Sequence, residues 1–289
     1  MTGPRAFHAD KTAGHRPALL DSTKHSTRGA PSPIAGVTYP VKSLFLTLCL
    51  PAVACAAPFT AVRDGESFTY KVGFAIFSNA GVIEISGKQD AAAGHDRIRV
   101  TVDSRSRGFV RALYEFDNKA EATIELPTSR LLAVHESGAD PKRATDSDFT
   151  IDYAKRVATY TDRVRTERSR EIPLPEGNDP IDLISALMQT RDWNMQPGDK
   201  RDLVVQFTRE LYAITLVAEG YETIITPMGK FRTLVVVPRM EKNPKGIFAR
   251  GGQIKVWIAQ DASHLPVQMQ LELKIGSATL MLTEHKVAK

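Results

Sequence analysis

Residues 97–102 read Arg-Ile-Arg-Val-Thr-Val, an alternation of polar and β-branched apolar residues. Because successive side chains of a strand point to opposite faces, this period of two predicts a β-strand with one buried face. Similar runs recur along the chain, at 67–72, 82–86, 203–207 and 268–275. Gly, Asp, Asn and Pro interrupt the runs at intervals of roughly 8 to 14 residues, which is typical of antiparallel sandwiches and barrels.

One segment, residues 179–191, departs from this pattern. It begins with Asp-Pro, a capping residue followed by proline at the first helical position, and it ends with a basic residue. Its apolar residues recur at helical spacing, at Ile181, Ile184, Leu187 and Met188. The segment therefore predicts one short amphipathic helix whose apolar face packs on the sheet.

The runs before and after this helix follow a similar order of strand, loop, strand, turn and strand, which indicates an internal duplication. Chance alternation of β-forming residues is the alternative. We expect a mainly β protein, an antiparallel sandwich or half-open barrel made of two related halves. The halves cover about 58–175 and 198–289, and the helix over 179–191 links them.

Residues 42–57 have the layout of an export signal, with a lysine, a short apolar run and small residues at the end. Residues 1–41 are polar and precede the region where such a signal should begin. We expect them to be either a misassigned start, with translation beginning at Val41 or Val37, or a disordered extension. Residues 58–289 would then form a single exported β-rich domain.

Both cysteines, Cys49 and Cys55, lie in this leader, so the exported domain would have no disulfide and no thiolate metal site. Cys55 is a candidate for lipidation in a degraded lipobox, and the Ala-Cys-Ala sequence around it fits an ordinary cleavage site equally well. No later apolar run is long enough to span a bilayer.

The positive charge of the chain is concentrated in the leader. Six of the 38 basic residues and two of the 33 acidic residues lie in residues 1–57, so the rest of the chain is nearly neutral. The net charge of +5 therefore gives no support for nucleic-acid binding.

From residue 59 to the end, the chain resembles the bacterial envelope family called domain of unknown function 3108. The resemblance rests on Tyr70, the hairpin at 74–81, the segment 179–191, the stretch 222–233 and the stretch 246–267. It implies an exported, mostly β protein similar to the half-open barrels of lipoprotein carriers. It implies no reaction, because the family has no assigned catalytic residues.

The sequence contains no specific catalytic or metal-binding motif. The histidines after the leader, at positions 95, 135, 264 and 285, have no second ligand at the spacing of a known metal motif, so we expect no metal and no cofactor. Acidic clusters occur at 146–152 and 115–125, and two carboxylates on a sheet could serve a glycoside hydrolase. Basic residues are interleaved with both clusters, which favours solvated surfaces.

Two loops at duplicated positions place apolar residues between cations, at 105–111 and at 245–250. Arginine could bind a phosphate while phenylalanine enters an acyl region; the alternative is a loop whose phenylalanine plugs an open end of the barrel. An internal cavity, if present, would be apolar. The candidate ligand-binding residues are Phe74, Ile76, Arg105, Arg107, Phe109, Leu183, Leu187, Met188, Phe248, Arg250 and Trp257.

These patterns favour an exported, non-enzymatic protein of the periplasm that binds an amphiphile such as a lipid, or an apolar part of another envelope protein. Association with the outer membrane through Cys55 is an alternative location. The alternative functions are a hydrolase or lyase acting on cell-wall or extracellular polysaccharide, and a structural adaptor. We expect no nucleic-acid partner and no transmembrane span after the leader.

Overall fold

The computed structural model describes residues 58–90, 96–273 and 276–287. All of them belong to one compact unit, Val53–Lys289. The predictions for the leader, for Cys55 and for the translation start lie outside the described residues.

The described chain is mainly strand. The strands are β1 (Ser67–Phe74), β2 (Phe77–Gln89), β3 (Arg97–Ser106), β4 (Asp117–Glu125), β5 (Leu131–Asp140), β6 (Arg143–Asp152), β7 (Val157–Asp162), β8 (Arg170–Pro173), β9 (Pro180–Asp182), β10 (Lys200–Phe207), β11 (Glu210–Thr226), β12 (Gly229–Arg239), β13 (Gln253–Ala259), β14 (Pro266–Leu273) and β15 (Gly276–Lys286). The helices are α1 (Gly108–Leu113) and α2 (Leu183–Gln189), with 3-10 turns η2 (Thr166–Arg168) and η3 (Phe248–Arg250).

All of these strands join one sheet, in the order β8-β7-β6-β5-β4-β3-β2-β1-β15-β14-β13-β12-β11-β10-β9. Neighbours are antiparallel except β9 and β10, which are parallel. The first and the last strand pair with each other along eight positions, from Ser67 opposite Lys286 to Phe74 opposite Ala278. This β1–β15 seam joins the two runs of strands into one surface.

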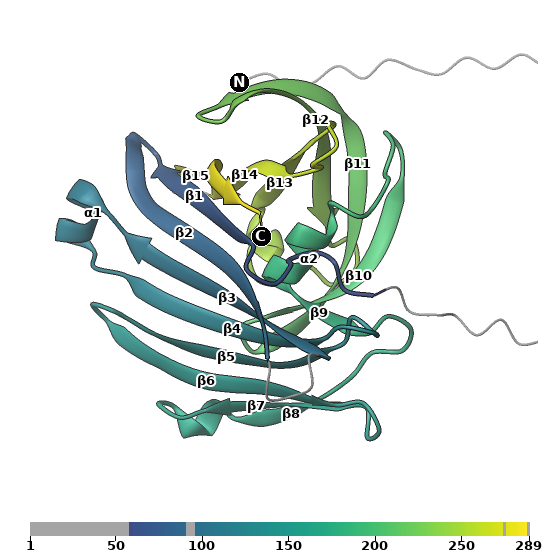
Figure 1. Cartoon of the computed structure of the whole chain (residues 1–289). Helices are drawn as coiled ribbons and strands as arrows, with labels where there is room; N and C mark the ends of the chain where they lie inside the picture. The colour runs from purple at the N-terminus through teal and green to yellow at the C-terminus, as the bar shows by residue number, and fades with distance from the viewer. Residues whose placement is uncertain (1–57, 91–95, 274–275, 288–289) are drawn as a thin grey trace, which may run out of the picture. The chain divides into compact units, whose positions relative to one another are not determined.

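The sheet curves around α2 (Figure 1) but is not closed into a barrel, because β8 and β9 are its two edges. The two ends approach each other through side chains. Arg170 of β8 binds Glu210 at 2.6 Å, and Arg130 next to β5 binds Asp179 next to β9 at 2.9 Å. The predicted mainly β class with an open, barrel-like sheet is thus confirmed.

The predicted helix is shorter than expected. Residues Pro180–Asp182 form β9, and α2 begins only at Leu183. The capping residue is Asp182 rather than Asp179, because Oδ1 of Asp182 accepts hydrogen bonds from the backbone N–H groups of Ile184 and Ser185 at 3.1 and 3.0 Å. Parallel pairing with β10 holds the preceding residues in an extended conformation.

A second helix, α1, forms where the sequence predicted only a loop. It follows Arg107 directly, and none of its residues is buried. In the other run of strands, the turn η3 occupies the corresponding place, so that β3-α1-β4-β5 and β12-η3-β13-β14 have the same order of elements. This order supports the duplication, which stays a prediction.

The core lies between the inner face of the sheet, the segment before β1 and α2. Its largest fully buried side chains include Phe68 and Ile85, and Met188 of α2 is 0% exposed. The β1–β15 seam contributes Tyr70 and Leu282 to the same core cluster. The period of two read from the sequence therefore places one face of these strands against α2.

Candidate functional site

Two rows of apolar side chains cross neighbouring strands on the inner face of the sheet. One row lies nearer the strand ends and runs from β1 through β15 and β14 to β13. Its members are cross-strand neighbours, in that order Phe74, Ala278, Leu271 and Ile254. The deeper row, in the same strand order, consists of Val72, Leu280, Met269 and Val256. We call these residues the apolar strip.

Burial changes abruptly along this face. The next pair below the strip, Tyr70 and Leu282, is 1% and 0% exposed, and the hydroxyl of Tyr70 donates to the carbonyl of Pro266 at 2.8 Å. Within the strip only Val256 is buried, and the other side chains remain partly exposed. The inner face is therefore a packed core at one end and a partly uncovered apolar surface at the other.

The partly uncovered end of the sheet is the end that carries α1, and we call it the α1 end. Strand β1 ends there and β2 begins there. Its edge carries apolar residues that are strongly exposed: Ile76 in the β1–β2 turn is 89% exposed, and Phe109 and Leu113 of α1 are 62% and 68% exposed. The rings of Phe77 and Phe109 lie 5.7 Å apart, so the turn and the helix touch. We call Ile76, Phe77, Phe109 and Leu113 the apolar rim.

The arginines near α1 differ in their partners. Arg105 binds Glu84 at 2.7 Å across β2 and β3, and Arg111 binds Glu115 and Asp117 at 2.7 and 2.8 Å. The hydrogen bond from Arg111 holds the pKa of Asp117 below its usual value. In the part of the chain that the structure describes, Arg107 has no ion-pair partner.

The loop of the second half also lies at the α1 end, because β12 ends there and β13 begins there. Phe248 is partly buried against the core, while Lys245 and Arg250 are exposed. The backbone N–H of Gly252 donates to the carbonyl of Ile247 at 2.9 Å and returns the chain to β13 beside Ile254 of the strip.

The structure brings Phe74, Ile76, Arg105, Arg107, Phe109, Phe248 and Arg250 to one end of the sheet. Ile76 is at the tip of a turn and does not line the interior, and Arg105 extends from the outer face. The other candidates lie elsewhere. Leu187 and Met188 are buried in the core, and Leu183 is 39% exposed at the start of α2.

Trp257 does not face the strip. It is opposite Val235 and Gln268, on the face that alternates with Val256 and Ile258, and its indole N–H donates to Glu222 at 2.8 Å. Sequence reasoning also missed the strip residues contributed by β14 and β15. Alternation in the run 268–275 would have found Met269 and Leu271 of β14, but only the strand register shows that Leu271 lies in one row with Phe74, through Ala278 of β15.

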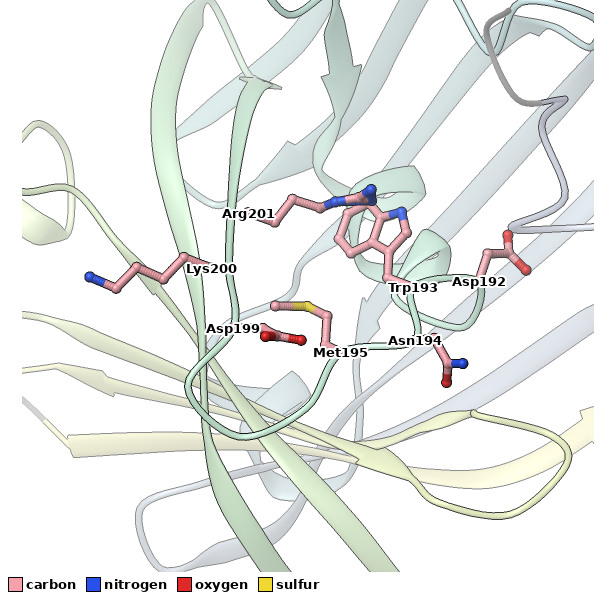
Figure 2. A pocket seen from close by; sticks show the side chains of 7 residues that line it. All are labelled: Asp192, Trp193, Asn194, Met195, Asp199, Lys200 and Arg201. Carbon is pink, nitrogen blue, oxygen red and sulfur yellow. The ribbon is translucent and has the colours of Figure 1, made fainter. Parts of the chain in front are cut away.

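Two surface depressions are lined largely by polar side chains, unlike the expected apolar cavity. One, of about 310 Å³, lies beside the loop after α2, where the guanidinium of Arg201 is 4.5 Å from the ring centre of Trp193 (Figure 2). The other, of about 230 Å³, lies over β3, β4 and β5 and is lined by residues such as Asn118 and Lys119.

The acidic clusters proposed for hydrolysis form surface ion pairs. Arg163 binds both Asp146 and Asp148, and Lys155 binds Asp152 at 3.1 Å. Among the described residues, no group of three or more His, Cys, Asp and Glu side chains is arranged to hold a metal ion. No helix in that part of the chain is long and apolar enough to cross a membrane.

One buried ionic cluster lies at the end opposite α1. Glu66, which is 1% exposed, binds Arg191 at 3.0 Å and His285 at 2.8 Å. Burial alone would raise the pKa of Glu66, but hydrogen bonds from Arg191, the backbone of Arg63 and His285 outweigh it and lower the pKa. The cluster ties the segment before β1 to the end of α2 and to β15.

The fold and this partly uncovered inner face define a class, the mainly β proteins with an open, barrel-like sheet. The model of the family described as protein of unknown function (DUF3108) matches residues 69–283, and the chain belongs to that family. No curated protein matches the chain.

One of the similar solved structures supports the fold. A β-barrel-like protein of domain of unknown function DUF1849 from Brucella abortus has a TM-score of 0.51 at 9% identity, covering 79% of this chain and 100% of that chain. A protein inferred to be a lipoprotein from Parabacteroides distasonis ATCC 8503 has a TM-score of 0.30 at 14% identity, covering 80% and 99%. An inferred exported protein from Bacteroides fragilis NCTC 9343 has the same TM-score and identity, covering 80% and 100%.

Proposed function

We propose that this protein is an exported, non-enzymatic protein of the periplasm that binds an amphiphile at the α1 end of its sheet. The apolar strip would hold the hydrocarbon part, and Arg107 and Arg250 would contact an anionic head group. The observation that carries this proposal is the partial exposure of the strip, next to inner-face residues that are fully buried.

The energetics favour an apolar ligand on the strip. Each methylene group that leaves water for an apolar surface contributes about 0.8 kcal/mol, and binding sites for small molecules are mostly apolar with a few polar groups that orient the ligand. The strip supplies aliphatic side chains from β1, β13, β14 and β15 in two aligned rows. Arg250 precedes β13 of the strip, and Arg107 follows β3 at the same end of the sheet.

A displacement assay tests the proposal. The purified protein is titrated with N-phenyl-1-naphthylamine, whose fluorescence rises in apolar surroundings, and the probe is then displaced with palmitate. We expect saturable probe binding and displacement. The double variant L271Q/L280Q should weaken probe binding about tenfold, because burying the exposed part of each leucine contributes on the order of 1 kcal/mol.

The matched control is M281Q. Met281 is next to Leu280 on β15 and is also partly exposed, but its side chain is on the outer face, opposite Lys71 and Gln268. M281Q should bind the probe like the parent protein, and thermal melts should show that all variants are folded. An unchanged affinity in folded L271Q/L280Q, or an equal loss in M281Q, would contradict the proposal.

A further inference from the structure

Three side chains of the apolar rim, Ile76, Phe109 and Leu113, are largely exposed to solvent. Single exposed apolar residues are ordinary on a protein surface, but neighbouring ones on adjacent elements indicate an interaction surface. Here Ile76, Phe109 and Leu113 are each more than 60% exposed, and they come from a turn and a helix that touch.

Local geometry holds these side chains outward. Phe74 pairs with Phe77 across a tight turn in which Ala75 has a φ of 51°, so Ile76 is at the tip. In α1, Phe109 and Leu113 are four residues apart and therefore lie on the same face of the helix. The backbone N–H of Arg107 donates to the carbonyl of Ala80 at 2.8 Å and fixes the start of α1 on β2.

The charges around the rim favour an anionic partner. The carboxylates of Glu84, Glu115 and Asp117 neutralise Arg105 and Arg111, but Arg107, beside Phe109, has no ion-pair partner in the described part of the chain. The loop of residues 240–252, at the same end, adds Lys242, Lys245 and Arg250 against the single acid Glu241.

We propose that the α1 end docks on a lipid bilayer with anionic head groups, with Ile76, Phe109 and Leu113 inserted at the interface and Arg107 among the head groups. Shallow insertion by a few apolar side chains beside cations is enough for peripheral membrane binding. A stable protein partner would need about 800 Å² on each side, far more than these side chains offer. The inference goes beyond the proposed function, because docking does not require an occupied strip.

The test is cosedimentation of the purified protein with large vesicles of phosphatidylglycerol, compared with phosphatidylcholine vesicles, at low ionic strength. We expect binding to phosphatidylglycerol that weakens as salt is added. The variant F109S/L113S should lose about tenfold or more of this affinity, and R107Q should lower binding to the anionic vesicles only.

The matched control is I225S. Ile225 is 74% exposed, as much as the rim residues, but it lies at the β11–β12 turn, at the opposite end of the sheet. I225S should bind vesicles like the parent. Unchanged binding of F109S/L113S, an equal loss in I225S, or no vesicle binding by the parent would overturn the inference. Vesicle binding without probe binding would reject the proposed function alone.

Discussion

At the scale of single residues, we expect the buried carboxylate of Glu66 to contribute more to the free energy of unfolding than an exposed acid does. Its oxygens accept hydrogen bonds from Arg191, His285 and the backbone N–H of Arg63. The guanidinium of Arg191 also donates to the carbonyl of Ala61 at 2.9 Å. A single side chain thus connects three segments that are far apart in sequence.

Replacing Glu66 with Gln should destabilise the fold by about 3 to 5 kcal/mol, because the nearly buried charge of Arg191 would lose its carboxylate partner. Urea denaturation measures this change in the free energy of unfolding. E284Q is the control, since Glu284 is exposed and its ion pair in the described part of the chain is with exposed Lys286. A loss below about 1 kcal/mol in E66Q would show that water compensates Arg191.

The same group predicts how stability depends on pH. The pKa of Glu66 is lower in the folded than in the unfolded chain, so the unfolded chain binds the proton more readily. The stabilisation by Glu66 should be complete above the ordinary pKa of glutamate and should disappear as pH falls through the lowered value. Denaturation between pH 7 and pH 3 should show a smaller pH dependence in E66Q than in the parent; an identical dependence would contradict this assignment.

At the scale of elements, α2 depends on its cap. Asp182 is buried, and burial raises the pKa of its carboxyl above the usual value even though it accepts backbone hydrogen bonds from Ile184 and Ser185. Carboxylate and amide oxygens can both accept these bonds, whereas alanine cannot. The charge and the cap can therefore be separated by substitution.

D182A should destabilise the protein by about 1 kcal/mol or more, and D182N should be at least as stable as the parent at neutral pH, because asparagine keeps the acceptor without a buried charge. Thermal denaturation followed by circular dichroism measures both variants. Equal destabilisation by D182N and D182A would show that the charge itself is required.

The elements also show what the sequence could predict. Alternation in 97–102 and 67–72 correctly predicted β3 and β1, because one face of each strand packs on the core. The sequence predicted a helix beginning at Asp179, because Asp-Pro is a strong local signal for a helix start. In the structure, pairing of β9 with β10 keeps residues 180–182 extended, and the helix begins after them. Six residues without a buried side chain or a side-chain cap give too little periodicity to predict α1.

The candidate site was only partly accessible to such reasoning. Phe109 and Arg107 stand out in the sequence because a Phe between arginines is unusual, and both lie at the α1 end. Trp257 was assigned to an inner lining because β13 is apolar on both faces, so alternation could not decide which way it points. Leu271 and Leu280 became visible as neighbours only through the register of β14 and β15.

At the scale of the whole described domain, the β1–β15 seam makes the two runs of strands depend on each other. Leu282 is 0% exposed at this seam, opposite Tyr70. L282A should therefore cost about 2 to 5 kcal/mol. The main core cluster contains residues of both runs, and a smaller cluster on β6 and β7 joins it through Val134 and Ile151, so the loss should affect the entire domain in a single cooperative transition.

Two probes can check this cooperativity. Both tryptophans, Trp193 and Trp257, follow β9 in the chain, so their fluorescence reports on the second run of strands, while circular dichroism reports on all strands. Their urea transitions should coincide in the parent and shift together in L282A. Separate transitions would show that the runs fold as independent units.

The seam also bears on how the chain matures. Nearly the whole described domain lies between β1 and β15 in the sequence, and until β15 is in place the edge of β1 that faces it has no hydrogen-bonding partner strand. Such an unpaired edge invites association between nascent copies, and contacts between distant parts of a sequence form slowly. Docking of β15 on β1, rather than formation of any single hairpin, therefore removes this central edge as a template for aggregation and leaves β8 and β9 as the two edges of the folded sheet.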